Sequence, residues 1–158
     1  MSKAIVTYFS ATETTKGLAE RLAHAIDADL FEIVPKQRYS DADLDWTKKT
    51  SRTSVEMNDP KCRPQIAKNI KDLSQYQVVF VGFPIWWYRE PSIIDTFMES
   101  YDFNGVTVVP FATSGGSSIG DANKNIRKIA PNANVVSGKR FSTDEPEHEL
   151  KKWATQWL

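Results

Sequence analysis

The sequence predicts an α/β protein of the three-layer, doubly wound type, in which helices cover both faces of a five-stranded parallel sheet. Strand-like and helix-like segments alternate five times along the 158 residues. The strand-like segments are nearly continuous apolar runs, which is typical of strands buried on both faces. Parallel strands need crossover connections, and these are right-handed almost without exception. We therefore expect one doubly wound domain over residues 1–158.

The first half of the chain predicts two strands and one clear helix. Residues 4–9 and 30–34 are rich in β-branched and aromatic side chains, and Pro35 ends the second run. The helix between them is predicted from apolar residues three and four positions apart, namely Leu18, Ala19, Leu22, Ala23 and Ile26. Residues 35–76 are polar and irregular, and we expect one short helix there, around residues 65–73.

The second half predicts three strands, each followed by a helix. The strands are expected at residues 78–83, at 106–111 and, more weakly, around Val135 and Val136. Pro91 suits the first turn of the helix after the 78–83 strand. The apolar positions of the three helices are Ile94, Phe97, Met98 and Tyr101, then Ile119, Ala122, Ile126 and Ile129, and finally Leu150, Trp153, Ala154, Trp157 and Leu158.

Composition and charge exclude several classes of protein. Lys plus Arg and Asp plus Glu both number 20, so the formal net charge is zero, which argues against nucleic-acid binding through clustered cations. The sequence has no signal-peptide pattern and no apolar run near the roughly 18 residues that span a bilayer. The single cysteine, Cys62, cannot form an intrachain disulfide and is typical of a reducing compartment. We expect a soluble cytoplasmic protein without a membrane partner.

The loop after the first strand is rich in hydroxyl side chains. It consists of Ser10, Ala11, Thr12, Glu13, Thr14 and Thr15. Hydroxyls and free N–H groups at a helix start favour an anion, and this loop contains no Lys or Arg. Helix capping is the alternative, but a cap needs one hydroxyl rather than four. Because the G-x-x-x-x-G-K-[ST] and G-x-G-x-x-G patterns are both missing, the loop indicates a mononucleotide phosphate.

Two further loops at strand ends suggest how the rest of such a ligand is held. The first contains Pro84, Ile85, Trp86, Trp87 and Tyr88. Three consecutive aromatic residues cannot all face one core, so at least one ring is expected to be exposed and to stack on a flat heteroaromatic ligand; a partner-binding patch is the alternative. The second contains Thr113, Ser114, Gly115, Gly116 and Ser117. Its glycines let backbone groups approach the edge of a ring, although a plain turn is also possible.

These three loops resemble those of the flavodoxin family, in particular its bacterial flavodoxin-like members. Ser10, Thr12 and Thr15 match the phosphate motif S/T-x-T-x-x-T, and residues 84–87 and 113–116 resemble the two isoalloxazine loops. The resemblance covers essentially the whole chain. It implies a flavodoxin-like sandwich with strand order 2-1-3-4-5, non-covalent binding of FMN by all the residues named in the three loops, and transfer of electrons through the flavin.

The sequence leaves the use of the flavin open. An electron carrier that meets a redox partner protein, an NAD(P)H-dependent reductase of FMN or quinone type, and a non-catalytic flavin-binding module are all compatible with it. We identify no general acid or base and no metal site; His24 and His148 are interpreted as solvated. The segment 38–54, with Tyr39 and Trp46, either folds over the flavin edge or crosses the sheet.

Overall fold

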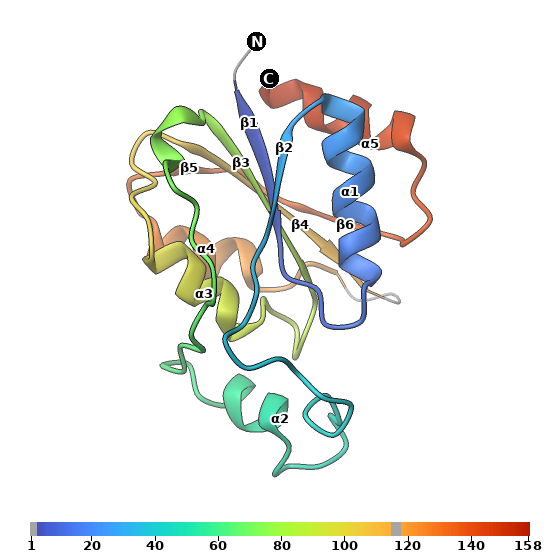
Figure 1. Cartoon of the computed structure of the whole chain (residues 1–158), viewed down its shortest axis with the longest axis vertical. Helices are drawn as coiled ribbons and strands as arrows, with labels where there is room; N and C mark the ends of the chain where they lie inside the picture. Colours follow the sequence, from blue (N-terminus) through green and yellow to red (C-terminus); the bar gives the residue numbers. More distant parts are fainter. Residues whose placement is uncertain (1–2, 115–117) are drawn as a thin grey trace.

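A parallel sheet forms the centre of the protein, shown in Figure 1 as a computed structural model that describes residues 3–114 and 118–158. Its strands run in the order β2-β1-β3-β4-β5, and β6 also pairs with β4. All of these pairs are parallel. The strands are β1 (Ala4–Tyr8), β2 (Asp29–Glu32), β3 (Val78–Pro84), β4 (Thr107–Thr113), β5 (Asn134–Val135) and β6 (Lys139–Phe141). The predicted strand order 2-1-3-4-5 is confirmed.

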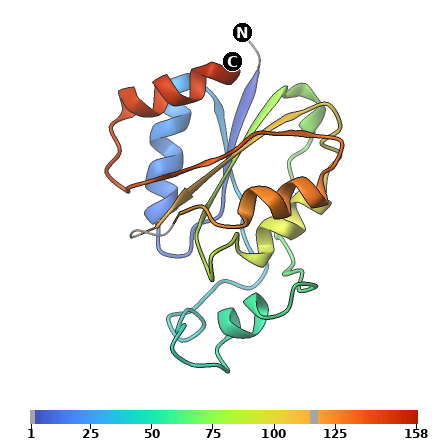
Figure 2. The same ribbon diagram turned by 180° about the vertical axis from the view of Figure 1, so that it is seen from behind.

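Helices cover both faces of this sheet, as the two opposite views show (Figures 1 and 2). These helices are α1 (Thr14–Ile26), α3 (Ser92–Glu99), α4 (Ala122–Ile129) and α5 (Glu147–Ala154). A further helix, α2 (Arg52–Met57), lies beyond the end of the sheet, and short 3-10 helices occur at Leu73–Gln75 and Thr155–Trp157. α1 and α5 pack on one face, whereas α3 and α4 pack on the other. The predicted three-layer architecture is therefore confirmed. Among the described residues, no helix is both long and apolar enough to cross a membrane.

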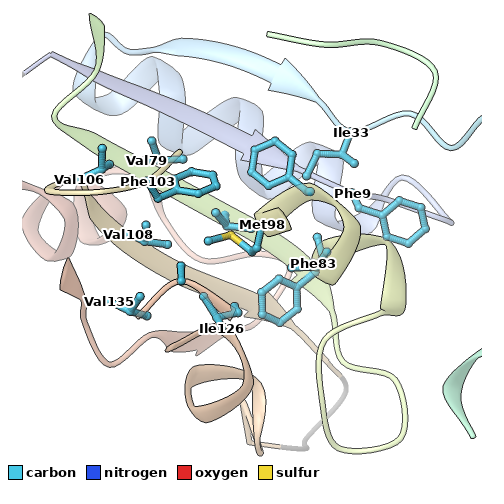
Figure 3. Close-up of a cluster of buried hydrophobic side chains, with 14 of the residues drawn as sticks. Phe9, Ile33, Val79, Phe83, Met98, Phe103, Val106, Val108, Ile126 and Val135 are labelled. Atoms are coloured by element: carbon cyan, nitrogen blue, oxygen red, sulfur yellow. The ribbon is translucent and has the colours of Figure 1, made fainter. Parts of the chain in front are cut away.

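Two buried clusters hold the layers together, one on each face of the sheet. On the α3 and α4 side, Phe9, Phe83 and Met98 belong to a core that is drawn in Figure 3. The other core includes Phe80 and Phe111, which face α1 and α5. Successive residues of β3 thus serve opposite cores, because side chains alternate across a strand. This burial on both faces explains why the strands are continuous apolar runs.

The fifth strand is interrupted opposite Pro110. Val108 pairs with Val135, but Phe111 pairs with Lys139, so the edge strand contains one residue more than β4 over this stretch. A proline has no N–H to donate to the ladder, and an interrupted edge strand tolerates that loss. A Cβ on Gly138 would lie 2.2 Å from the Pro110 carbonyl oxygen, so the extra residue fits only without a side chain. The weak fifth strand of the sequence is thus two pieces, and β6 continues towards the edge of the sheet where β4 ends.

The prediction of a helix around residues 65–73 is wrong. Only its last residue belongs to a helical element, the 3-10 helix Leu73–Gln75. The preceding residues run beside the chain that leaves β2: Ala67 N donates to the Val34 oxygen (2.7 Å) and Lys36 N donates to the Gln65 oxygen (2.8 Å). These partners replace helical hydrogen bonds. The short helix of this region is α2, which begins after Ser51, whose side chain accepts a hydrogen bond from Ser54 N.

Candidate functional site

The three loops singled out in the sequence leave neighbouring strands at one edge of the sheet. β1, β3 and β4 are adjacent and parallel, so their carboxyl ends and the loops that follow lie together (Figure 1). Ile85 N donates to the Thr113 oxygen (3.1 Å), and the hydroxyls of Thr15 and Thr113 are 2.8 Å apart. Each of the three loops therefore contacts another directly. Gly115, Gly116 and Ser117 lie outside the described residues.

The hydroxyls of the loop 10–15 have different surroundings. Ser10 Oγ accepts a hydrogen bond from Lys16 N (3.2 Å), which is the capping role considered above. Thr15 is buried and holds Thr113. Thr12 and Thr14 are exposed, with their hydroxyls 3.3 Å apart. Two hydroxyls thus serve the protein itself, and two face solvent at the helix start.

The start of α1 is arranged to receive an anion. Its N-cap residue, Glu13, has a left-handed backbone (φ 67°) and provides no side-chain cap. The thirteen-residue helix therefore directs its positive end at a turn flanked by the exposed Thr12 and Thr14. Such helix ends bind phosphate through backbone N–H groups. Ala11, which precedes Thr12, is half-buried against the α3 and α4 core.

A hollow of about 480 Å³ lies beside this helix start and brings in a cation that the sequence analysis missed. Its lining is Thr12, Thr14, Pro84, Ile85, Thr113, Ser114, Arg140, Ser142 and Thr143. Arg140 comes from β6, where its Nε donates to Ser114 Oγ (3.2 Å) and its Nη2 to the Ser114 oxygen (3.0 Å). A guanidinium has five donors, so others remain for a ligand. The sequence did offer one signal for Arg140. A fifth strand parallel to the others must end at the same edge of the sheet as the three loops, so a cation near its carboxyl end could lie beside them.

The aromatic loop after β3 closes in a tight turn. Trp86 N donates to the Arg89 oxygen (3.0 Å) and Arg89 N to the Trp86 oxygen (3.1 Å). The two central residues, Trp87 and Tyr88, have φ values of 49° and 64°. Positive φ at both centres defines a type I′ turn, which normally uses Asn-Gly. Bulky residues in this region cost about 1–3 kcal/mol each, so the turn is strained.

The N-terminal approach to α4 holds this strained turn in place. Asp121 N donates to the Tyr88 oxygen (3.0 Å). A Cβ on Gly120 would lie 2.1 Å from the same oxygen, so only glycine allows this approach. The turn presents its two side chains outward: Trp87 is 37% exposed and Tyr88 is 75% exposed. The expectation of exposed rings in this loop is therefore confirmed.

Trp86, by contrast, is fixed in a cluster of three rings. Its ring centroid is 5.5 Å from those of Phe9 and Tyr39, and the last two are 5.7 Å apart. All three pairs are edge-to-face, a favourable geometry for aromatic rings. The Arg52 guanidinium lies 3.8 Å from the Tyr39 ring centroid, and Tyr39 donates its hydroxyl to Glu56. Burial and that carboxylate raise the pKa of Tyr39, so it stays neutral.

The segment 38–54 lies over the aromatic loop rather than across the sheet. Tyr39 packs on Trp86, and Trp46 lines a hollow of about 440 Å³ together with Ile85, Trp86, Trp87 and Tyr88. Arg89 Nη2 donates to the Met57 oxygen (3.1 Å), which ties α2 to the same loop. Figure 1 shows α2 and its flanking chain beyond the carboxyl edge of the sheet. The alternative that this segment crosses the sheet is therefore wrong.

A buried carboxyl pair lies directly behind the aromatic loop. Glu90 is fully buried and accepts a hydrogen bond from Asn125 Nδ2 (3.0 Å). Its other oxygen, Oε2, and Asp95 Oδ1 are buried without a hydrogen-bond donor, which one shared proton would satisfy. Burial, followed by the Asp95 carboxyl, raises the pKa of Glu90 to about 9. Arg89 lies close to both carboxyls, 3.6 Å from Asp95 and 3.8 Å from Glu90, whereas Arg63 contacts Asp95 alone at 3.9 Å. The more buried Glu90, with the raised pKa, is therefore the member of the pair that holds the proton.

The two histidines lie away from these loops. His24 contacts Glu147, whose carboxylate raises the pKa of the imidazole, and His148 lies 3.4 Å from Glu149. Both histidine side chains are largely exposed. Within residues 3–114 and 118–158, no group of three or more His, Cys, Asp or Glu residues is placed to hold a metal ion.

Similarity to known proteins extends over nearly the whole chain. The sequence model of the flavodoxin family matches residues 3–157. A protein from Bacteroides eggerthii DSM 20697 that is proposed to be a flavoprotein is 48% identical, with a TM-score of 0.93 over 99% of this chain and 98% of that one. A similar protein from Bacteroides uniformis ATCC 8492 is 45% identical, with a TM-score of 0.92 over 98% of both chains. A flavoprotein from Lactobacillus acidophilus NCFM, solved in complex with FMN, is 22% identical, with a TM-score of 0.73 over 98% of this chain and 99% of that chain. No curated protein matches.

The strained turn leads to a prediction about stability. Replacing Trp87 by Asn and Tyr88 by Gly should raise the free energy of unfolding by about 1–3 kcal/mol, because Asn-Gly suits a type I′ turn. Urea unfolding of the ligand-free protein measures the change. The matched control is Trp87→Ala with Tyr88→Ala, which removes the same rings but keeps a Cβ at both positions. Equal stabilisation by both pairs would show that exposed rings, and not backbone strain, carry the cost.

The carboxyl pair leads to a prediction about pH. The pKa of Glu90 is raised in the folded state, so its contribution to stability is complete below its unfolded value and is lost as the pH rises towards about 9. Wild-type stability should therefore fall as the pH rises from about 5 towards 9, because the unfolded chain releases this proton while the folded protein keeps it. Glu90→Gln should flatten this slope in urea unfolding series, whereas Glu99→Gln, a half-exposed carboxylate beside Arg63, should not. An unchanged slope in Glu90→Gln would contradict a protonated Glu90.

Proposed function

The chain belongs to the flavodoxin family, and on this premise we propose that it binds one FMN at the carboxyl edge of its sheet and transfers electrons through it. The observation that carries the proposal is that the two hollows are neighbours: Ile85 lines both the one beside the start of α1 and the one beside the aromatic loop. A molecule with an anionic end and a flat ring fits the two together. FMN has this form, and the solved Lactobacillus flavoprotein with FMN supports the choice.

The phosphate would be held at the start of α1. Thr12 and Thr14 offer exposed hydroxyls, the first turn of α1 offers N–H groups other than Lys16 N, and Arg140 offers a positive charge beside the same hollow. Each hydrogen bond to a charged group contributes about 1.5–3 kcal/mol. Ser10 and Thr15 would support this site through Lys16 N and Thr113 rather than by facing solvent themselves.

The ring would lie against the aromatic loop. Trp86 is fixed by Phe9 and Tyr39, and the turn beyond it exposes Trp87 and Tyr88. A strained turn at a binding site is held by the surrounding structure so that its side chains are positioned before the ligand arrives. FMN supplies the redox chemistry when bound, and the protein binds it, orients it and controls the access of water and partners to it.

The phosphate site can be tested by comparing ligands. Thr12→Ala combined with Thr14→Ala should weaken FMN binding by about ten-fold or more, since two hydrogen bonds to a charged group are lost, and should leave riboflavin binding within about two-fold. Flavin fluorescence titration of the apoprotein gives both dissociation constants. Thr155→Ala, an exposed threonine in the C-terminal 3-10 helix, is the control. Equal losses for FMN and riboflavin would place the phosphate elsewhere.

The electron-transfer role can be tested by anaerobic reduction of the FMN-loaded protein. We expect the visible flavin band to bleach with NADPH only when an NADPH-oxidising flavoprotein reductase is also present, because an electron carrier needs a redox partner. Dithionite serves as the control that the flavin can be reduced. Rapid bleaching by NADH or NADPH alone would contradict a carrier and establish a reductase. Failure of the partner reductase together with NADPH, in a protein that dithionite bleaches, would also count against electron transfer.

A further inference from the structure

Trp46 is a large apolar side chain that the fold leaves in solvent. It is 74% exposed, although it lies in the middle of the segment that packs on the aromatic loop. Tyr39, in the same segment, is half-buried against the core. Large exposed apolar side chains indicate a binding surface when they line a pocket. The surroundings of Trp46 therefore decide what it does.

The backbone around Trp46 is firmly anchored. Thr53 donates to the Asp43 oxygen through both its hydroxyl (2.7 Å) and its N–H (3.1 Å). Arg52 lies 3.9 Å from the Asp43 carboxylate and also stacks on Tyr39. On the other side of Trp46, Thr47 N donates to Asp45 Oδ1 (3.1 Å). The turn that carries the indole is thus fixed to α2 by hydrogen bonds, and the ion pair between Asp43 and Arg52 links it to the three-ring cluster.

Two separate parts of the chain line the hollow beside Trp46. The aromatic loop forms one wall through Ile85, Trp86, Trp87 and Tyr88, and Trp46 comes from a different part of the chain. Its volume of about 440 Å³ lies within the usual range of small-molecule pockets, about 300–1,000 Å³. Ile85 also lines the hollow beside the start of α1, so the two hollows are neighbours. A ligand anchored at the start of α1 by a phosphate could therefore place its other end beside Trp46.

We propose that Trp46 stacks on the outer face of the isoalloxazine ring, so that the ring is enclosed between the aromatic loop and the segment 38–54. The inference rests on the proposed binding of FMN at this edge of the sheet. It assigns Trp46 a contact with the ring end of the ligand alone. The phosphate end, held by Thr12 and Thr14, does not depend on it.

This separation defines the experiment. Apoprotein is titrated with FMN, riboflavin and lumiflavin, which share the ring and differ in the ribityl chain and phosphate. Trp46→Ala should weaken all three by the same factor, about three- to ten-fold, as expected for one lost aromatic stack. Trp46→Phe should recover most of the loss. Val55→Ala is the matched control, because Val55 is a 57% exposed apolar residue of α2 that does not line the hollow.

The outcomes are distinguishable. An equal loss for the three ligands, with an unchanged thermal midpoint and rescue by Phe, supports the stack. Affinities of Trp46→Ala within two-fold of the wild type, or a loss restricted to FMN, would overturn it while the proposed binding of FMN stands. A wild-type protein that takes up none of the three ligands would instead overturn the proposed function, and the inference with it.

Discussion

The alignment of the carboxyl ends of β1, β3 and β4 is the constraint on which the rest of the structure depends. Tyr8 is in register with Gly82, and Phe9 N donates to the Gly82 oxygen (2.9 Å), so the chain leaves both strands at the same level. After β1 the chain turns outward to β2, and it returns to β3 on the other side of β1. The strand order therefore reverses between β1 and β3, and in open α/β sheets the crevice at such a point binds ligands. The hydroxyl loop and the aromatic loop are the two sides of this crevice.

The carboxyl edge of the sheet contains features that lower the stability of the fold, and the two buried cores offset that loss. The turn at Trp87 and Tyr88 has an unfavourable backbone, and Glu90 directly behind it must keep its proton to be buried beside Asp95. Both features are held from the α4 side: Asp121 contacts the Tyr88 oxygen, and Asn125 contacts Glu90. Strained backbone and buried ionisable groups are often found at functional sites, where residues are selected for function at some cost in stability. The N-terminal part of α4 thus supports the aromatic loop from behind, and the side chains of Trp87 and Tyr88 in that loop face outward.

The buried parts of the fold could be predicted from the sequence, whereas parts of the site could not. Continuous apolar runs are buried only as strands of a sheet that is covered on both faces. Stripes such as Leu18, Leu22 and Ile26 are buried when a helix packs on that sheet, so the two patterns together leave few other folds. The helix expected near residue 65 was wrong because a polar segment can exchange helical hydrogen bonds for pairing with the chain after β2. Arg140 reaches the hydroxyl loop only through the pairing of β6 with β4. The type I′ turn has no Asn-Gly signal, and the position of Trp46 depends on contacts of Asp43 that the local sequence does not reveal.

In the binding mode proposed above, one FMN lies across both hollows, with its phosphate at the start of α1 and its ring between Trp46 and the aromatic loop. A crystal structure of the protein with FMN would show whether this is so. We expect phosphate oxygens within hydrogen-bond distance of the Thr12 and Thr14 hydroxyls, and an isoalloxazine ring in contact with both Trp46 and Trp86 or Trp87. A phosphate away from the start of α1, or a ring outside the hollow that Trp46 and Ile85 line, would contradict it.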